Sequence, residues 1–259
     1  MTWTTRPRSD LGGLSAITAG TGPLVVLLHG VGLRAEAWNR QIDALRGAHR
    51  VIAIDLPGHG DSTLPAEEPD LDRLTDLIAA RIPGRALIIG HSMGAMLALG
   101  LAVRHPDKTA GVAALNAVYR RPADAAAAVR ARAAALDGVG VADPSATLAR
   151  WFGAAPSPER SACEAWLRGV NPAGYRMAYG VFAQGDAPAD AALAALRCPA
   201  LFMTGAQEPN STPAMARAMA ALAPDGCAQI IQDAAHMMPM THPLAVNAAL
   251  EGLAARVFA

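Results

Sequence analysis

The sequence predicts an α/β fold with a mostly parallel, doubly wound sheet and a helical cap inserted between two strands. Three observations support this expectation. Short runs of strand length alternate with helical patterns, the runs are apolar on both faces, and one long interval contains helical signals without a convincing strand. The chain has 259 residues, of which 52% are hydrophobic, and this is enough for one large core. We therefore expect a single domain with an insertion.

The predicted strands begin with two weak edge candidates, at 3–8 and 14–18. Stronger apolar runs follow at 24–29, 51–56, 86–91, 111–116, 200–205 and 228–233. Helical patterns occupy the intervals at 35–45, 71–81, 93–105, 213–222 and 243–257. Alternation of this kind predicts helices on both faces of the sheet.

The interval 119–197 predicts a helical cap. Helix starts are marked by a capping residue followed by proline at Asp143-Pro144, Ser157-Pro158 and Asn171-Pro172. Most of the aromatic residues also gather here, where they either line a pocket or pack the cap onto the sheet: Trp151, Phe152, Trp166, Tyr175, Tyr179 and Phe182. The sequence thus divides into a first core part (1–118), the cap (119–197) and a second core part (198–259).

Composition excludes several kinds of partner. Basic and acidic residues number 22 each, so no basic field is available to bind nucleic acid or an anionic membrane. The first ten residues lack the apolar segment of a secretory signal, and the longest apolar runs are too short to span a membrane. We expect a cytoplasmic protein. Cys163, Cys198 and Cys227 are too widely spaced for a zinc site and predict buried thiols, and no metal or other cofactor is expected.

The stretch LIIGHSMGAM at 87–96 predicts a nucleophile. It contains Gly-x-Ser-x-Gly, with Ser92 between Gly90 and Gly94, directly after an apolar run and before a helical pattern. A sharp turn from strand to helix needs neighbours almost without side chains, and it presents the serine hydroxyl at the end of the sheet. The helix that follows directs its free N–H groups at this position.

A serine hydroxyl needs a base, and the base needs an acid that holds its tautomer. Among seven histidines, His236 is the best candidate, because it lies in the loop after the last predicted strand. Glu208 follows the penultimate strand and lies between serine and histidine in chain order, as the acid should. Its rivals are Asp186, Asp225 and Asp233.

Backbone N–H groups should stabilise the oxyanion that develops during acyl transfer. One donor is expected from Met93, at the start of the helix after Ser92. The second is expected from Val31, because Gly30 and Gly32 keep the backbone open around it in the loop after the first central strand.

With these residues in place, the sequence resembles the α/β-hydrolase superfamily over nearly its whole length outside the cap. The motifs that carry the resemblance are LLHGVG (27–32), DLPGHGDS (55–62), GHSMG (90–94), the acid loop (205–213) and AAHMMP (234–239). The resemblance is greatest to small, cofactor-free members with a helical cap, such as carboxylesterases and enol-lactone hydrolases. It implies a triad of Ser92, His236 and Glu208. The chain departs from these relatives at Glu208, where they usually carry aspartate, and at Ala95, where they often carry glycine.

The expected reaction is hydrolysis of a small carboxylic ester or lactone through an acyl-Ser92 intermediate. One alternative is hydrolysis of a carbon–carbon bond in a vinylogous diketone of the ring-fission type, which capped relatives perform with the same triad. Another is a ligand-binding protein without catalysis, since the fold alone does not determine function. Substrate contacts are expected from Arg34, Tyr119, Trp151 and Met237, and Arg120 and Arg121 are further candidates for binding a substrate carboxylate.

Overall fold

A computed structural model describes residues 3–259. Its centre is an eight-stranded sheet in the order β1-β2-β4-β3-β5-β6-β7-β8, in which β1 and β2 are antiparallel to their neighbours and the other strands are parallel. The strands are β1 Ser9–Asp10, β2 Ser15–Ala19, β3 Leu24–Leu28, β4 Arg50–Ile54, β5 Ala86–His91, β6 Thr109–Leu115, β7 Ala200–Gly205 and β8 Gly226–Ile231. The predicted α/β class and its mostly parallel sheet are confirmed.

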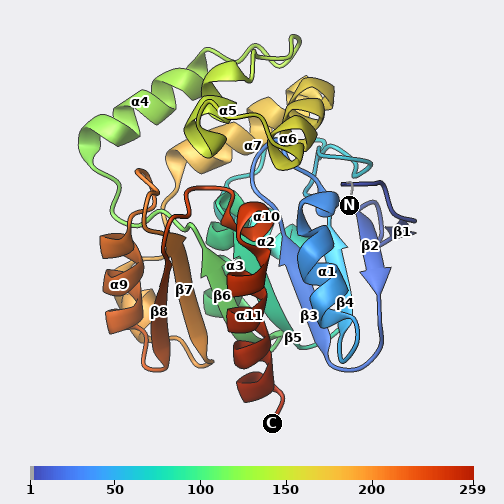
Figure 1. Cartoon of the computed structure of the whole chain (residues 1–259), viewed down its shortest axis with the longest axis vertical. Coiled ribbons are helices and arrows are strands. Elements are labelled where there is room, and N and C mark those ends of the chain that lie inside the picture. Colours follow the sequence, from blue (N-terminus) through green and yellow to red (C-terminus); the bar gives the residue numbers. More distant parts are fainter. Residues whose placement is uncertain (1–2) are drawn as a thin grey trace.

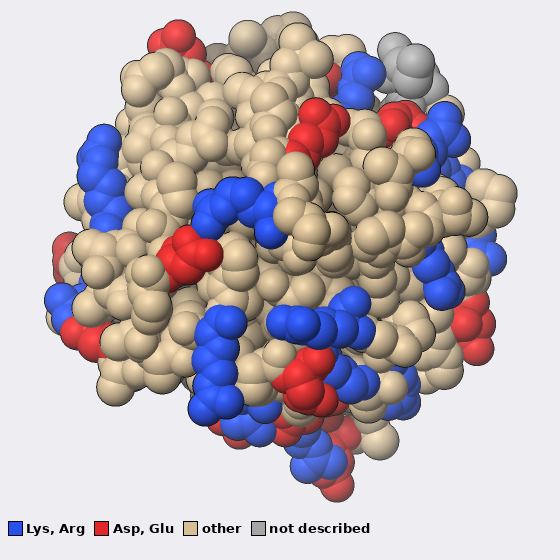
Figure 2. Space-filling model, turned by 90° about the horizontal axis from the view of Figure 1, so that it is seen from below, with Lys and Arg blue, Asp and Glu red and all other residues tan. Residues whose placement is uncertain are grey.

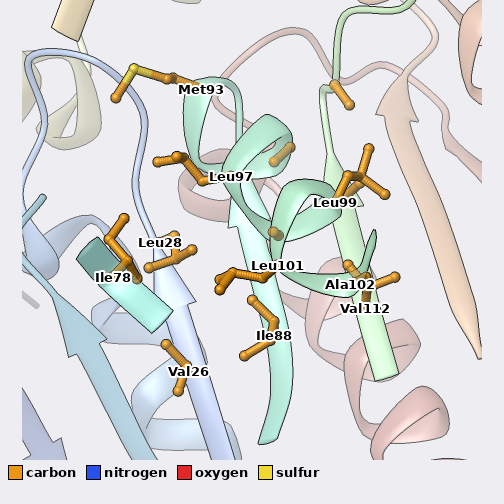
Figure 3. Close-up of a cluster of buried hydrophobic side chains, with 14 of the residues drawn as sticks. Val26, Leu28, Ile78, Ile88, Met93, Leu97, Leu99, Leu101, Ala102 and Val112 are labelled. Atoms are coloured by element: carbon orange, nitrogen blue, oxygen red, sulfur yellow. The ribbon is translucent and has the colours of Figure 1, made fainter. Parts of the chain in front are cut away.

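Helices cover both faces of the sheet (Figure 1). One face is covered by the 3₁₀ helix η1 (Ala35–Trp38), α1 (Asn39–Leu45) and α11 (Pro243–Val257), and the other by α2 (Leu71–Ala79), α3 (Met93–Arg104) and α9 (Pro213–Leu222). The short helix α10 (Met238–Thr241) precedes α11. The central strands carry apolar side chains on both faces, so each face forms its own buried cluster. Figure 3 shows part of one cluster, where Leu97 and Leu101 of α3 pack near Leu28 of β3 and Ile88 of β5.

Five helices lie between β6 and β7: α4 Ala123–Ala134, α5 Ser145–Phe152, α6 Pro158–Gly169, α7 Pro172–Gln184 and α8 Asp190–Ala194. In Figure 1, α4 to α7 form a layer above one end of the sheet, while α8 packs beside α9. Two of the three predicted helix starts are found as expected, at α6 and α7, where Ser157 and Asn171 accept hydrogen bonds from backbone N–H groups in the first turn. The third differs, because α5 begins at Ser145 and Pro144 precedes it without a side-chain cap. We refer to α4–α7 as the cap below.

The structure differs from the sequence prediction in three places. The segment 3–8 is not a strand. Its side chains Arg6 and Arg8 form ion pairs with Asp43 of α1 and Glu36 of η1. The predicted strand at 51–56 ends at Ile54, and the side chain of the next residue, Asp55, accepts a hydrogen bond from the Ala35 N–H (2.7 Å). Cys163 and Cys198 are buried as expected, but Cys227 is exposed on β8, the edge strand of the sheet.

The charge distribution agrees with a neutral chain. On the face shown in Figure 2, basic and acidic side chains lie interspersed among uncharged residues. Among the described residues, many charged side chains form ion pairs, such as Arg104 with Asp72 (2.8 Å) and with Asp76 (2.6 Å). Within residues 3–259, no helix is long and apolar enough to cross a membrane.

Candidate active site

Ser92 occupies a strained turn between β5 and α3. Its backbone φ is 57° and its ψ is −119°, a conformation that few residues with a side chain adopt. A Cβ atom at Gly90 would lie 1.9 Å from the Gly94 carbonyl oxygen, and one at Gly94 would lie 2.1 Å from the Leu28 oxygen. The motif glycines are therefore required by the close contact of strand, helix and the neighbouring β3. The turn leaves Ser92 half-buried at the wall of a cavity.

The structure brings His236 and Glu208 together. Nδ1 of His236 lies 2.8 Å from Oε2 of Glu208, although the two residues come from the loops after β8 and β7. Because the carboxylate can only accept here, the Nδ1–H donates and Nε2 is left as the basic nitrogen. The longer glutamate side chain thus reaches the imidazole in the position where relatives were expected to carry aspartate.

The Glu208 carboxylate is buried and held in its charged form. Its Oε1 accepts hydrogen bonds from the backbone N–H groups of Asn210 (2.8 Å) and Ser211 (3.4 Å), and its Oε2 also accepts one from Asn116 Nδ2 (3.4 Å). Burial by itself would raise the pKa of Glu208, but the charge and hydrogen bond of His236, together with the N–H groups of Asn210 and Ser211, lower this pKa to about 2. Glu208 is therefore an anion at neutral pH and can stabilise an imidazolium.

Two aromatic rings fix the orientation of His236. His91, the residue before Ser92, has its Nε2 2.8 Å from the His236 carbonyl oxygen. Burial and the nearby His236 lower the pKa of His91 to about 3, so its ring is neutral and donates this hydrogen bond through Nε2–H. On the cap side, the Trp151 indole stacks on the His236 imidazole.

Hydrogen bonds of two buried histidines fix the predicted oxyanion loop. His59 Nε2 accepts the Gly32 N–H (3.0 Å), and His29 Nε2 accepts the Leu56 N–H (2.9 Å). Burial lowers the pKa of both rings, that of His59 to about 4, so both are neutral acceptors. Val31 lies between these fixed points and lines the cavity. Met93 is the first residue of α3, where the N–H groups have no acceptor inside the helix.

A cavity of about 320 Å³ joins these groups. Ser92, His236 and Val31 lie in its wall beside residues of the cap and of the acid loop, including Trp151 and Asn210. Within the described chain, no hydrogen bond links the Ser92 hydroxyl to His236. In enzymes, the hydrogen bond between nucleophile and base often forms fully only when substrate is bound. Three arginines from the cap segment also line the cavity: Arg121, Arg132 and Arg150.

Three of the expected substrate contacts lie elsewhere. The part of the cavity wall formed by residues 3–259 does not include Arg34, Tyr119 or Met237. Arg34 binds Glu36 (2.9 Å), which keeps its guanidinium in an ion-pair cluster beside the oxyanion loop. The Tyr119 hydroxyl donates to Asp190, and Met237 is buried in a small apolar cluster with Leu33 and Leu148. These three side chains therefore do not line this cavity, whereas Trp151 does.

Most of the other acids and arginines considered from the sequence bind partners elsewhere. Asp186 accepts the Arg121 N–H (3.0 Å), and Asp225 pairs with Arg256 (2.5 Å). Asp233 is exposed in a turn with φ of 59°. Arg120 pairs with Asp190 and does not line the cavity formed by the described residues.

Sequence reasoning missed several residues of the site. The supporting hydrogen bonds of His91 and Asn116 are visible only in three dimensions. In the sequence, His91 is the last residue of β5 and Asn116 directly follows β6, at the edge of the sheet where Ser92 lies. Arg132 and Arg150 carried no signal, because arginine on a helix is usually a solvated surface residue. Among residues 3–259, no group of histidine, cysteine or acidic side chains is arranged to hold a metal ion.

Comparison with known proteins decides the family. A sequence model of the alpha/beta hydrolase family matches residues 25–249. The chain belongs to this family. It is 41% identical over 239 residues to (E)-2-((N-methylformamido)methylene)succinate hydrolase of Acinetobacter baylyi, covering 90% of each chain. It is 34% identical over 238 residues to the pimeloyl-(acyl-carrier protein) methyl ester esterase of Chromobacterium violaceum, covering 87% of this chain and 91% of the relative.

The fold is also that of solved family members. A thermophilic esterase from Thermogutta terrifontis, solved with malate bound, superposes with a TM-score of 0.84 at 26% identity, covering 94% of this chain and 93% of the esterase. The resemblance inferred from the motifs is thus confirmed, and the relatives support hydrolase activity for this chain.

Proposed function

We propose that the protein is a serine hydrolase that cleaves a small carboxylic ester or lactone through an acyl-Ser92 intermediate. The observation that carries this proposal is the meeting of three parts of the chain at one cavity: the strained turn of Ser92, the imidazole of His236 and, behind it, the buried Glu208 carboxylate. The esterases among the relatives support the same reaction class.

In the first half of the reaction, Ser92 Oγ attacks the substrate carbonyl carbon while His236 Nε2 takes the hydroxyl proton. Glu208 stabilises the imidazolium through Nδ1–H. The oxyanion accepts hydrogen bonds from the N–H groups of Val31 and Met93. When the tetrahedral intermediate collapses, the bond to the leaving oxygen breaks and that oxygen receives the proton from His236.

In the second half, His236 Nε2 takes a proton from a water molecule, whose oxygen attacks the acyl carbon. Collapse of this second intermediate releases the carboxylic acid and returns the proton to Ser92. A lactone follows the same steps, except that the leaving hydroxyl remains attached to the product. No cofactor is needed for either half.

A second candidate is hydrolysis of an N-acyl enamine that carries carboxylates. The relative that is 41% identical is named for a formamido-methylene succinate, which contains an amide bond and two carboxylates. The cavity wall offers Arg132 and Arg150 as binding groups for carboxylates, with Arg121 buried beneath the Phe182 ring nearby. Attack of Ser92 on the formyl carbon would use the same triad, with nitrogen instead of oxygen as the leaving atom.

The proposal is tested by labelling and by turnover. A fluorophosphonate probe should label the folded protein on Ser92, and the Ser92→Ala and His236→Ala variants should lose at least a thousandfold in kcat/KM on p-nitrophenyl acetate. Glu208→Gln should lose less, since it keeps the shape of the side chain and removes the charge. Folded protein in which Ser92 is not labelled would overturn the scheme, and full activity of Glu208→Gln would overturn the role of that acid.

A substrate panel separates the candidate reactions. Turnover should be compared for p-nitrophenyl esters, small lactones, N-acyl enamines of succinate and a vinylogous diketone of the ring-fission type. The ester or lactone proposal predicts the highest kcat/KM in the first two groups. Preference for the enamine or for the diketone would reassign the substrate and leave the triad in place.

A further inference from the structure

A second cavity lies among the cap helices, open to solvent beside exposed residues such as Val141 and Ala146, and it shares a wall with the catalytic cavity. Its volume is about 300 Å³, close to the 320 Å³ of the catalytic cavity. The residues that line it all come from the cap segment between Arg132 and Tyr179. Five residues line both cavities, and they form the shared wall: Arg132, Thr147, Arg150, Tyr175 and Tyr179. A ligand at Ser92 therefore has a second, equally large space one layer of side chains away.

The outer part of the cap cavity is apolar. Its walls come from the loop after α4, the start of α5, the end of α6 and the start of α7, and they include Leu136, Val141, Ala146, Leu167, Val170 and Pro172. The one carboxylate in this wall belongs to Asp143, and it already accepts the hydroxyl of Ser145 (2.8 Å). Hydrogen bonds from Ser145 lower the pKa of Asp143, so it remains an anion that disfavours a second negative charge at this end.

The shared wall is cationic and polar. Arg132 Nε donates to the Tyr179 hydroxyl (3.0 Å), and Arg150 donates to Thr147 Oγ1 (3.3 Å). In the described chain, neither guanidinium lies within 4.0 Å of a carboxylate, whereas Arg121 is paired with Asp186. Burial raises the pKa of the Tyr175 phenol to about 12, so this side chain contributes no negative charge. The wall thus offers two cations without acidic partners between an apolar space and the catalytic groups.

We propose that the cap cavity is a second substrate compartment, which binds the hydrocarbon chain of an amphipathic substrate whose carboxylate lies at the wall of Arg132 and Arg150. The proposal rests on the proposed function for the position of the reacting group. Apolar surface leaves water favourably in proportion to its area, and a carboxylate forms its best hydrogen bonds with guanidinium groups. A substrate sized only for the catalytic cavity would leave the apolar compartment unused.

Binding of unreactive carboxylates tests the compartment directly. Titration calorimetry of the Ser92→Ala variant with straight-chain monocarboxylates, from butanoate to decanoate, should show affinity rising about three- to fourfold per added methylene until the chain fills the cavity. Affinity that does not change with chain length would overturn the proposal. Because no turnover is measured, this result does not depend on whether Ser92 is the nucleophile, and Ser92 labelling decides that question separately.

A matched pair of variants locates the chain. Ala146 and Ala149 are both exposed on α5, but only Ala146 lines the cap cavity. In the Ser92→Ala background, Ala146→Phe should abolish the dependence on chain length, while Ala149→Phe should retain it. Circular dichroism checks folding, and Ala142→Phe in the preceding loop provides a second way to fill the same cavity. Chain-length dependence that survives both blocking substitutions would place the hydrocarbon elsewhere and reject the compartment.

Discussion

The Trp151 indole stacks on the His236 imidazole, with ring centroids 5.4 Å apart and planes inclined by 20°. Trp151 belongs to α5 of the cap, whereas His236 lies in the loop after β8. The proposed catalytic base, His236, therefore has one face against the cap and receives its other contacts from the core. An aromatic face attracts a cation, so this stack favours the imidazolium that forms during the reaction.

Replacing Trp151 should slow catalysis. Cation–π contacts contribute about 0.5–2 kcal/mol, so Trp151→Leu should lower kcat about 2- to 30-fold, and Trp151→Phe should recover part of the loss. Trp166→Leu is the control, because Trp166 packs against Trp3 and lines neither cavity formed by the described residues. An unchanged kcat in Trp151→Leu would show that the indole acts only as part of the cavity wall.

His91 is expected to act as a positioning residue for His236. It donates to the His236 carbonyl oxygen (2.8 Å) and does not line the catalytic cavity of the described chain. The variant His91→Ala loses this hydrogen bond and should lower kcat about 2- to 13-fold with little change in KM, since one buried hydrogen bond contributes about 0.5–1.5 kcal/mol. His91→Gln has an amide donor and should recover part of the activity. Equal rates for the two variants would contradict this role.

The fold was predictable because its signals are local. Apolar runs of strand length fixed β5 and β7, and the glycines around Ser92 could be recognised because only a turn this tight needs them. Glu208 could be predicted as the acid of the site from its place after a strand. The substrate contacts were not predictable in the same way. Arg34 lies beside the predicted oxyanion loop in the sequence, but a buried acid, Glu36, binds it. Arg132 reaches the cavity only because the cap folds over the sheet, and no sequence period encodes that arrangement.

Arg8 should be important for stability, although it lies far from Ser92 in the sequence. Its guanidinium binds the buried carboxylates of Glu36 (2.6 Å) and Asp55 (3.2 Å), whose side chains are 1% and 0% exposed. In Arg8→Met these acids would stay buried without their partner, so we expect a loss of about 3–5 kcal/mol in the free energy of unfolding. Arg6→Met, which removes a more exposed pair with Asp43, should lose about 1 kcal/mol or less. Urea denaturation of both variants measures the difference, and equal losses would contradict a special role for Arg8.

Stability should fall below pH 6.5. His59 and His91 have folded-state pKa values of about 4 and about 3, and the pKa of His29 is also lowered, so all three rings take up protons more readily in the unfolded chain. Their contribution is complete above the unfolded pKa of about 6.5 and is lost as the pH falls toward these lower values. Glu208 adds a loss in the same direction below its unfolded pKa of 4.5, toward its folded value of about 2. Thermal unfolding should give a constant Tm between pH 7 and 8 that declines at lower pH, with a shallower decline in His91→Gln. A Tm that stays constant to pH 4 would contradict the burial of neutral rings.

The cap should be sensitive to a single methyl group where its backbone touches the core. A Cβ atom at Gly174 of α7 would lie 1.9 Å from the Gly58 carbonyl oxygen, and Gly58 is itself fixed in a turn with φ of +73°. In Gly174→Ala, the helix must therefore move away from the loop that carries His59, and Tyr175 in the cavity wall must move with it. We expect a loss of about 1–3 kcal/mol in stability and a lower kcat/KM. Gly180→Ala is the matched control. Gly180 lies on the same helix, and a Cβ atom there would meet nothing within 4 Å. That variant should gain about 0.5–1 kcal/mol from the better helix propensity of alanine. If the two variants unfold at the same temperature and turn over substrate equally well, then the contact between Gly174 and Gly58 does not hold the cap in place.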